Sequence, residues 1–324
     1  MKNDDCCCQN LLVCAPTGSG KTNVAMLTLL REIGRHVGRD GKIRQDAVPF
    51  KIVYLAPLKA LATEVTTKFT HALGVLGVQV KELTGDTKLS RAEIAKTHVL
   101  VATPEKWDVM TRKSADISLT SQLRLLIIDE VHLLHEERGA VLETLVVRTL
   151  RQVEQTQCMI RIVSLSATLP NYRDVSCFLR VEETGLFFFG PQYRPVPLSQ
   201  IFCGVKKQQN PRAEKQIMND IAWRKVADSV EGGNQCLVFV HARNDTVRTA
   251  LEFLKNMLEE GKEFSAKDEC DTWDIEARKV ATSRNAEMKE LFLSGLGTHH
   301  AGMLRSDRLL MERNFEKGLI KVFL

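Results

Sequence analysis

The chain has 324 residues, of which 44% are hydrophobic and 26% are charged, and its formal net charge is +5 at pH 7. This composition is that of a soluble globular protein with room for two domains, and the mildly basic balance permits contact with a polyanion. The sequence contains neither a signal-peptide pattern nor a run of about twenty apolar residues, so it indicates neither secretion nor membrane insertion.

The nine cysteines are scattered without the spacing of metal ligands. The consecutive residues Cys6, Cys7 and Cys8 cannot chelate one ion in tetrahedral geometry. Cys14 and Cys236 lie in apolar runs, where a free thiol packs as a small core residue. We therefore expect a reducing compartment, in the nucleus and/or the cytosol.

The first predicted element is a short strand over Leu11 to Cys14. The turn APTGSGKT at residues 15–22 follows it, and then Val24, Leu27 and Ile33 recur at helical spacing. A strand, a glycine-rich turn and a helix form the context of a phosphate-binding loop. Glycine lets backbone N–H groups approach phosphate oxygens, and a helix N-terminus favours an anion. The alternative is a glycine-rich connection that contains a Lys-Thr pair by chance.

ATP is the expected ligand of this turn. Lys21 would reach the β- and γ-phosphates, and the Thr22 hydroxyl would complete the coordination shell of a magnesium ion, Mg2+. Ala15 stands where the general pattern G-x-x-x-x-G-K-[ST] has its first glycine. The expected ATP-binding residues are Ala15, Thr17, Gly18, Ser19, Gly20, Lys21 and Thr22.

Further strands are predicted at the apolar runs 51–56, 78–83, 99–102, 123–128 and 160–165. A stretch with helical character follows each run. This alternation predicts an α/β fold in which a mostly parallel sheet is covered on both faces. Ligands of such sheets bind beyond the carboxyl ends of the strands, and a polar cluster follows each run at that edge.

The run 123–128 ends in the sequence Asp129, Glu130, Val131, His132. An acidic residue at such a position can hold magnesium, and a neighbouring carboxylate can orient or deprotonate an attacking water. We assign Asp129 to the metal, together with Thr22, and Glu130 to the water, so the expected catalytic residues are Lys21, Asp129 and Glu130. The alternative is a solvated acidic turn.

Three other strand ends carry groups that can hold the phosphates and sugars of a nucleic acid without reading its bases. They are the turns PLKALATE at 57–64, TGD at 84–86 and TPEKWD at 103–108. A loop with a helix cap is an equally consistent interpretation of each. In the second half of the chain, His299 and His300 lack a partner at zinc-ligand spacing, which favours a pair that is satisfied within the protein or that faces nucleic acid. The expected contacts are Pro57, Lys59, Thr84, Gly85, Thr103, Pro104 and His299.

The segment 187–200 contains prolines and has no clear period, so it is interpreted as the boundary between a domain at 1–190 and a domain at 191–324. In the second domain we expect helices at 214–231, from 241 to about 260, at 275–293 and at 304–315. Strands are expected at 236–240 and from residue 320, with a loop at 261–272 and a turn at 295–300.

The motifs APTGSGKT, PLKALATE, TGD, TPEKWD, DEVH, SAT, LVFVHAR and THHAGM occur in the order and rough spacing of the superfamily 2 helicases of the DExH type, which the chain resembles. HLLHEERG at 132–139, LSATLPNY at 165–172 and RPVPL at 194–198 are similar to the large two-cassette helicases within that group. Alanine in place of the first glycine is usual in this superfamily. The resemblance covers nearly the whole chain.

The resemblance implies a RecA-like domain followed by a truncated second RecA-like domain, and ATP hydrolysis coupled to 3′ to 5′ unwinding. It implies that His132, Ser166 and Thr168 couple the nucleotide site to the rest of the motor. The implied partners are single-stranded or partly duplex RNA or DNA and proteins of a multi-subunit complex, with no membrane.

Two types within the group are candidates. The sequences at 187–189 and 240–250 favour the first cassette of the cointegrator-complex type, which implies DNA alkylation repair or ribosome rescue. The sequence at 31–43 is similar to the spliceosomal U5-type RNA helicases, which are the alternative.

The family's second-domain segment Q-x-x-G-R-x-G-R does not occur in the sequence, and neither does the upstream segment that holds adenine. We therefore expect an incomplete gene product or a fragment of a larger cassette. A catalytically inert nucleic-acid-binding or assembly module is the rival hypothesis from another class, and a nucleotide-binding protein without a nucleic-acid partner is a third.

Overall fold

The computed structural model describes residues 9–38, 43, 49–87, 89–112, 117–267 and 271–324. The chain divides into two compact units, Met1–Gln200 and Ile201–Leu324, whereas the domains expected from the sequence meet at residues 190 and 191. The prediction for Cys6 to Cys8 lies outside the described residues. Each unit is described by itself.

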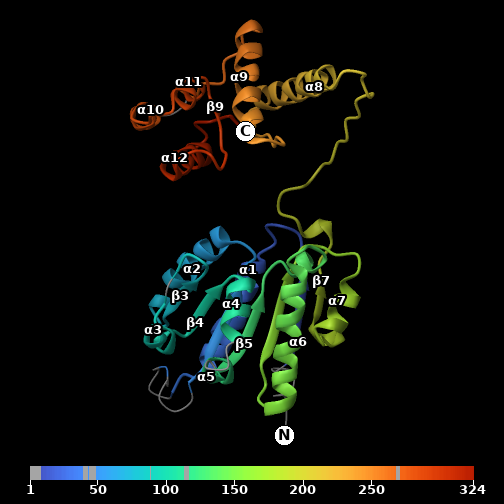
Figure 1. Ribbon diagram of the computed structural model, residues 1–324, viewed down its shortest axis with the longest axis vertical. Helices are drawn as coiled ribbons and strands as arrows, with labels where there is room; N and C mark the ends of the chain where they lie inside the picture. Colours follow the sequence, from blue (N-terminus) through green and yellow to red (C-terminus); the bar gives the residue numbers. More distant parts are fainter. Residues whose placement is uncertain (1–8, 39–42, 44–48, 88, 113–116, 268–270) are drawn as a thin grey trace. The chain divides into compact units, whose positions relative to one another are not determined.

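The first unit is built on a parallel sheet whose described strands number seven. Their spatial order is β3-β4-β2-β5-β6-β1-β7, with β3 and β7 at opposite edges (Figure 1). The strands are β1 (Leu11–Cys14), β2 (Lys51–Leu55), β3 (Val80–Leu83), β4 (Val99–Ala102), β5 (Leu123–Ile128), β6 (Arg161–Ser166) and β7 (Leu186–Phe188). The predicted α/β class with a parallel sheet is confirmed.

Helices cover both faces of this sheet because successive residues of a strand point to opposite sides. In β2, Ile52 and Tyr54 pack in one core with helices α1 (Lys21–Arg35) and α2 (Lys59–Gly74). The alternate residues Val53 and Leu55 pack in a second core. Its helices are α4 (Pro104–Thr111), α5 (Ile117–Ser121), α6 (Gly139–Thr156) and α7 (Tyr172–Phe178). The short helix α3 (Arg91–Lys96) lies between β3 and β4, and the 3-10 helix η3 (Val131–His135) lies between β5 and α6.

The buried face of α1 differs from the expected one. Ala25, Leu29 and Ile33 face the sheet, whereas Leu27 is 66% exposed. Residues four positions apart lie on one stripe of a helix, and Leu27 is turned about 200° from Ala25 around the axis. The predicted helix is therefore confirmed, but the assignment of Leu27 to its apolar stripe was wrong.

The segment interpreted as a domain boundary begins with a strand. Leu186–Phe188 (β7) pairs in parallel with β1 and forms the edge of the first sheet, after the short helix η4 (Glu183–Gly185). Because β7 covers only three residues, it carries no alternation long enough to be recognised in the sequence. A single turn, η5 (Pro191–Tyr193), follows it.

The second unit has a three-stranded parallel sheet in the order β8-β10-β9, formed by β8 (Cys236–Leu237), β9 (Leu296–Gly297) and β10 (Val322–Phe323). Helices α8 (Pro211–Glu231) and α9 (Arg243–Glu259) contribute to one core. Helices α10 (Trp273–Ala281), α11 (Ala286–Leu293) and α12 (Arg305–Glu316) contribute to another.

Three expectations for this unit were wrong. The helix predicted at 275–293 is two helices, because Asn285 caps the start of α11 by accepting a hydrogen bond of 3.0 Å from the backbone N–H of Met288. The strand predicted at 236–240 ends at Leu237, and β9 lies inside the segment predicted as a turn. No helix in the described part of the chain is long and apolar enough to cross a membrane.

Candidate nucleotide site and neighbouring turns

The glycine-rich turn lies between β1 and α1, at the carboxyl edge of the sheet. Gly18 and Gly20 have φ angles of 83° and 93°, a region that favours glycine. Gly20 is the N-cap of α1, and no side chain among the described residues caps this helix start. The first backbone N–H groups of α1 are thus oriented toward a position where an anion can accept their hydrogen bonds.

Lys21 folds back over this turn. Its Nζ donates to the carbonyl oxygens of Ala15 at 2.9 Å and Pro16 at 3.1 Å, and the Ser19 hydroxyl donates to Pro16 at 2.7 Å. The ammonium is therefore held at the mouth of the turn, where phosphate oxygens can replace the two carbonyls. Thr17 is exposed and Thr22 is half-buried at the first turn of α1.

Asp129 lies at the end of β5, next to β2. Its Oδ2 accepts a hydrogen bond of 2.6 Å from the Tyr54 hydroxyl, and its Oδ1 accepts one of 3.0 Å from the backbone N–H of Glu130. Burial raises the pKa of Asp129 above its usual range, although these two bonds and the charge of Lys21 oppose the rise. Because β1 and β5 both pair in parallel with β6, the glycine-rich turn after β1 and the acidic pair after β5 share one end of the sheet.

Glu130 occupies a left-handed backbone conformation, with a φ of 51°. Its Oε2 is buried and has no hydrogen-bond partner among the described residues. His132 Nδ1 lies 3.3 Å from this oxygen, but the same nitrogen accepts a hydrogen bond from the backbone N–H of Ala167 at 3.2 Å. A nitrogen that accepts that bond has no proton to donate, so the contact with Glu130 is not a hydrogen bond.

The unpaired oxygen makes this position chemically notable. Burial and the neighbouring charge of Asp129 raise the pKa of Glu130, in that order of size. A carboxylate with an elevated pKa and a free acceptor oxygen suits the orientation or deprotonation of a water. The described residues include no cluster of three His, Cys, Asp or Glu side chains that could hold a metal alone. One carboxylate and one hydroxyl fit a magnesium ion that takes its remaining ligands from phosphate and water.

The expected coupling residues are only partly in contact. His132 reaches the backbone of Ala167, between Ser166 and Thr168. Ser166 is fully buried, and its carbonyl oxygen accepts a hydrogen bond of 3.0 Å from the backbone N–H of Ala15. Thr168 is exposed. The contact between His132 and the segment that follows β6 is therefore made to the backbone N–H of Ala167.

Two of the three turns expected to contact nucleic acid form one cluster. Lys59 Nζ lies 2.8 Å from Asp86 Oδ1, and a Cβ added at Gly85 would lie 3.4 Å from the same Nζ. Thr84 is fully buried, and its hydroxyl donates to Glu82 Oε1 at 2.9 Å. The first turn of α2 and the end of β3 are thereby held together.

The third turn adjoins the first through Arg138. Its Nη1 donates a hydrogen bond of 2.7 Å to the carbonyl oxygen of Pro57, and its Nε lies 3.6 Å from Glu105 Oε1. Thr103, the N-cap of α4, and Pro104, its first residue, are buried next to Glu105. Their side chains therefore shape the turn, and the exposed groups near it belong to other residues.

His299 belongs to the second unit. Its Nε2 and Glu312 Oε1 are 2.7 Å apart, and its ring lies edge-on to Phe323 with a centroid separation of 5.8 Å. Its backbone N–H donates to the carbonyl oxygen of Leu324 at 2.7 Å.

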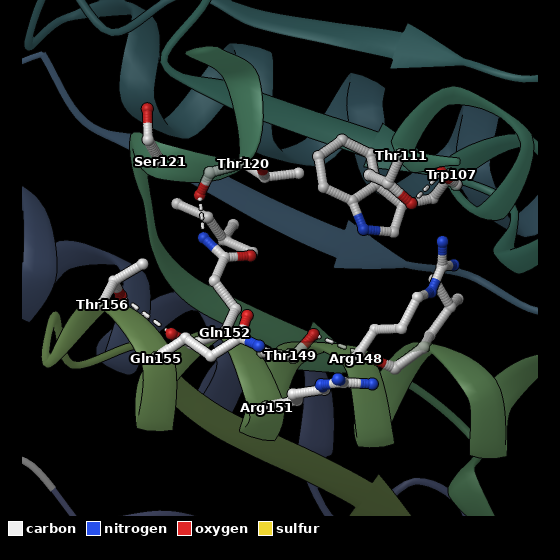
Figure 2. Close-up of a pocket in the computed structure, with 12 residues that line it drawn as sticks. Trp107, Thr111, Thr120, Ser121, Arg148, Thr149, Arg151, Gln152, Gln155 and Thr156 are labelled. Atoms are coloured by element: carbon white, nitrogen blue, oxygen red, sulfur yellow. Dashed lines mark hydrogen bonds between the residues drawn. The ribbon is translucent and has the colours of Figure 1, made fainter. Parts of the chain in front are cut away.

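A cavity of about 320 Å³ lies apart from all these residues, among α4, α5, α6 and the first residue of β5 (Figure 2). Gln152 reaches across it and donates a hydrogen bond of 2.7 Å to the carbonyl oxygen of Thr120, while the ring of Trp107 forms the opposite wall. Leu123 begins β5 and Asp129 follows its end, so the cavity lies near the amino edge of the sheet, away from the candidate site.

Sequence reasoning missed Tyr54, Ala167 and Arg138. Tyr54 lies inside an apolar run, and its hydroxyl reaches Asp129 only because β2 and β5 are neighbours in the sheet. Ala167 acts through its backbone N–H, which every residue but proline has. Arg138 falls within HLLHEERG, a motif that served only to recognise the group of relatives.

The chain has clear relatives among known proteins. The family model of the DEAD/DEAH box helicases matches residues 5–175. Activating signal cointegrator 1 complex subunit 3 of Danio rerio is 54% identical over 317 residues. The DExH-box ATP-dependent RNA helicase DExH14 of Arabidopsis thaliana is 51% identical over 316 residues. Each alignment covers 97% of this chain but 20% of the first relative and 14% of the second, so the chain spans a minor part of their length.

The fold also recurs in solved structures. The crystal structure of the DUF1998 helicase MrfA bound to DNA has a TM-score of 0.64 and 16% sequence identity, and the match covers 97% of this chain and 39% of that chain. At this identity the likeness shows the fold alone. It agrees with the RecA-like architecture expected from the motifs.

Proposed function

The chain belongs to the DEAD/DEAH box helicase family, and from this premise we propose that it forms the motor portion of an ATP-dependent nucleic-acid helicase. The observation that carries the proposal is the convergence at one sheet edge of Lys21, Asp129 and Glu130, with the buried Glu130 Oε2 unpaired. This arrangement supports a nucleotide site with a carboxylate prepared to accept a proton from water.

Each residue of the site has a distinct proposed role. The backbone N–H groups of 17–22 hold phosphate oxygens, and the Lys21 ammonium leaves the carbonyls of Ala15 and Pro16 to contact the outer phosphates. Thr22 and Asp129 hold the magnesium ion, which neutralises charge on the phosphates when bound. Glu130 orients the attacking water and accepts its proton at Oε2.

We propose that structural changes caused by nucleotide binding are transmitted from this site to the turn after β6 through a backbone contact. His132 follows the two carboxylates in the chain, and its Nδ1 accepts a hydrogen bond from the backbone N–H of Ala167. A movement of the segment after β5 therefore shifts the turn after β6. Ser166 and Thr168 flank that contact and share the proposed coupling role. Nucleic acid is proposed to contact the turns at Pro57, Lys59, Thr84, Gly85, Thr103 and Pro104 in the first unit. For the second unit by itself, His299 is proposed as a nucleic-acid contact.

The finer function remains a proposal drawn from the relatives. The cointegrator complex subunit and the motifs at 187–189 and 240–250 support a cointegrator-type helicase that works 3′ to 5′ in a protein complex, in alkylation repair or ribosome rescue. The relative named as an RNA helicase supports the alternative of an RNA substrate. The proposed compartment is the nucleus and/or the cytosol.

The test compares the wild-type chain with Lys21→Ala and with Lys68→Ala, a control lysine whose partner is Glu64 on the exposed face of α2. Lys21→Ala is expected to abolish binding of a fluorescent ATP analogue, and Lys68→Ala to preserve it. Unaltered nucleotide binding by Lys21→Ala contradicts the site assignment.

The nucleic-acid part needs its own measurement. Binding of single-stranded RNA and DNA is titrated at several salt concentrations, because neutralised phosphates give a defined salt dependence. Duplexes with a 3′ or a 5′ single-stranded tail test polarity. Failure to bind either nucleic acid at low salt contradicts the helicase proposal but leaves the nucleotide site intact.

A further inference from the structure

Arg138 connects the acidic segment with two turns on neighbouring strands. It precedes α6, and its guanidinium contacts the carbonyl oxygen of Pro57 and the carboxylate of Glu105. We propose that Arg138 is a positioning residue that transmits the state of the nucleotide site to the nucleic-acid turns. The inference rests on the proposed function and adds to it a residue through which the two ligands influence each other.

The strand order of the sheet explains why Arg138 can contact segments that follow two neighbouring strands. In space β2 lies between β4 and β5. The start of α4, just after β4, carries Glu105, the turn after β2 carries Pro57, and the segment after β5 carries Asp129, Glu130 and Arg138. Arg138 therefore joins the carboxyl ends of three adjacent strands, two of which bear expected nucleic-acid contacts and one of which bears the catalytic carboxylates.

The segment between Glu130 and Arg138 is short and internally bonded. Three backbone hydrogen bonds follow one another along this segment. The N–H of Leu133 donates to the carbonyl oxygen of Glu130 at 3.0 Å, the N–H of Glu136 to that of Leu133 at 3.0 Å, and the N–H of Gly139 to that of Glu136 at 2.8 Å. A Cβ added at Gly139 would overlap the carbonyl oxygen of Leu134, so η3 and the start of α6 are packed backbone against backbone. A displacement of the acidic pair is consequently carried to Arg138 rather than absorbed between them.

The two contacts of Arg138 differ in strength. The side chains of Arg138 and Glu105 are 49% and 45% exposed, so their ion pair is weak. The bond to the Pro57 carbonyl is short and has a charged donor, and Pro57 itself is buried. Arg138 thus contributes more to the position of the Pro57 turn than to the stability of the fold. Lysine can supply one donor to Pro57 but lacks the planar fork that also faces Glu105.

The experiment measures linkage between the two ligands in the full 324-residue chain. The dissociation constants of fluorescein-labelled oligo(U) and oligo(dT) are determined by anisotropy, with and without magnesium and a nonhydrolysable ATP analogue. The ratio of the two constants is the coupling factor, and for coupled sites it is typically ~5–150-fold. Strand binding must change the affinity for the analogue by the same factor, which provides a second, independent readout.

Arg138→Gln is expected to bring the coupling factor to within ~2-fold of one, while the affinity for the analogue alone stays near that of the wild type. Arg138→Lys is expected to keep part of the coupling, because it preserves one donor. The matched control is Arg180→Gln, which removes an exposed arginine paired with Glu154 at 2.5 Å in the same unit. Thermal unfolding of each variant verifies that the chain is folded.

Three outcomes overturn the inference: wild-type coupling retained by Arg138→Gln, an equal loss in Arg180→Gln, or a wild-type coupling factor of one. Absence of any strand binding by the wild type contradicts the proposed function itself, and the inference fails with it. A collapse of coupling that is confined to the Arg138 variants supports the inference.

Discussion

The hydroxyl of Tyr54 donates a hydrogen bond of 2.6 Å to Oδ2 of Asp129. Tyr54 is buried in β2, and Asp129 follows the neighbouring strand β5. Burial of the phenol and, after it, the neighbouring Asp129 carboxylate raise the pKa of Tyr54, which therefore stays a donor at every physiological pH. A residue of the sheet interior thus fixes the orientation of the carboxylate that is proposed to hold magnesium.

Tyr54→Phe removes this donor and preserves the ring. We expect the pKa of Asp129 to rise further, because the lost hydrogen bond stabilised its charged form, so magnesium-dependent nucleotide binding will require a higher pH. Leaving Oδ2 buried without its donor should also cost about 1–2 kcal/mol of stability. Nucleotide titrations from pH 5 to 8 and urea unfolding provide the measurements. Tyr193→Phe, at a 54% exposed tyrosine, is the control, and an equal shift in both variants contradicts the prediction.

Glu130→Gln should separate binding from turnover. The amide keeps the size of the side chain but cannot accept a proton, so strand-stimulated ATP hydrolysis should fall by about 10²–10⁴-fold while nucleotide affinity is retained. A phosphate-release assay and analogue binding measure the two quantities. Glu136→Gln, at an exposed residue just after η3, should leave both unchanged. Equal loss of affinity and turnover in Glu130→Gln would argue against its proposed role.

The same substitution makes a prediction about stability and pH. Because folding raises the pKa of Glu130, the folded chain retains a proton that the unfolded chain releases, and stability declines as the pH rises from the ordinary value of 4.5 through the raised one. Glu130→Gln should therefore stabilise the chain at pH 7 and give little gain below pH 4.5, where the acid is protonated in both states. Thermal unfolding of the wild type and of Glu130→Gln, at pH 7 and below pH 4.5, measures the gain in stability. An identical gain at both pH values contradicts the raised pKa of Glu130.

Two glycines offer a matched test of the junction between η3 and α6. Alanine at Gly139 would overlap the carbonyl oxygen of Leu134, so we expect a loss of about 1–3 kcal/mol. Gly74 ends α2 with no atom within 4 Å of an added Cβ, and alanine there should stabilise by about 0.5–1 kcal/mol. Chemical denaturation of both variants checks the signs. A tolerated Gly139→Ala would mean that the junction can move, which also weakens the argument for Arg138.

The amino-acid sequence by itself determined the local features of this protein. The glycine-rich turn, the apolar runs of β2, β4, β5 and β6, and the acidic pair after β5 follow from residue type and spacing over short distances. Local preference also indicated the helix after the turn, although it misassigned Leu27 to the buried face. It could not separate α10 from α11, because the side-chain cap of Asn285 interrupts an otherwise continuous helical pattern.

Only the tertiary structure decided which strand ends are neighbours. The order β4-β2-β5-β6 places Tyr54 against Asp129, His132 against Ala167 and Arg138 against Pro57, although these partners lie 75, 35 and 81 positions apart in the chain. Such contacts depend on strand order and on backbone groups that carry no residue-specific signal. The sequence therefore indicated the components of the site, whereas the packing of the sheet determined how they touch.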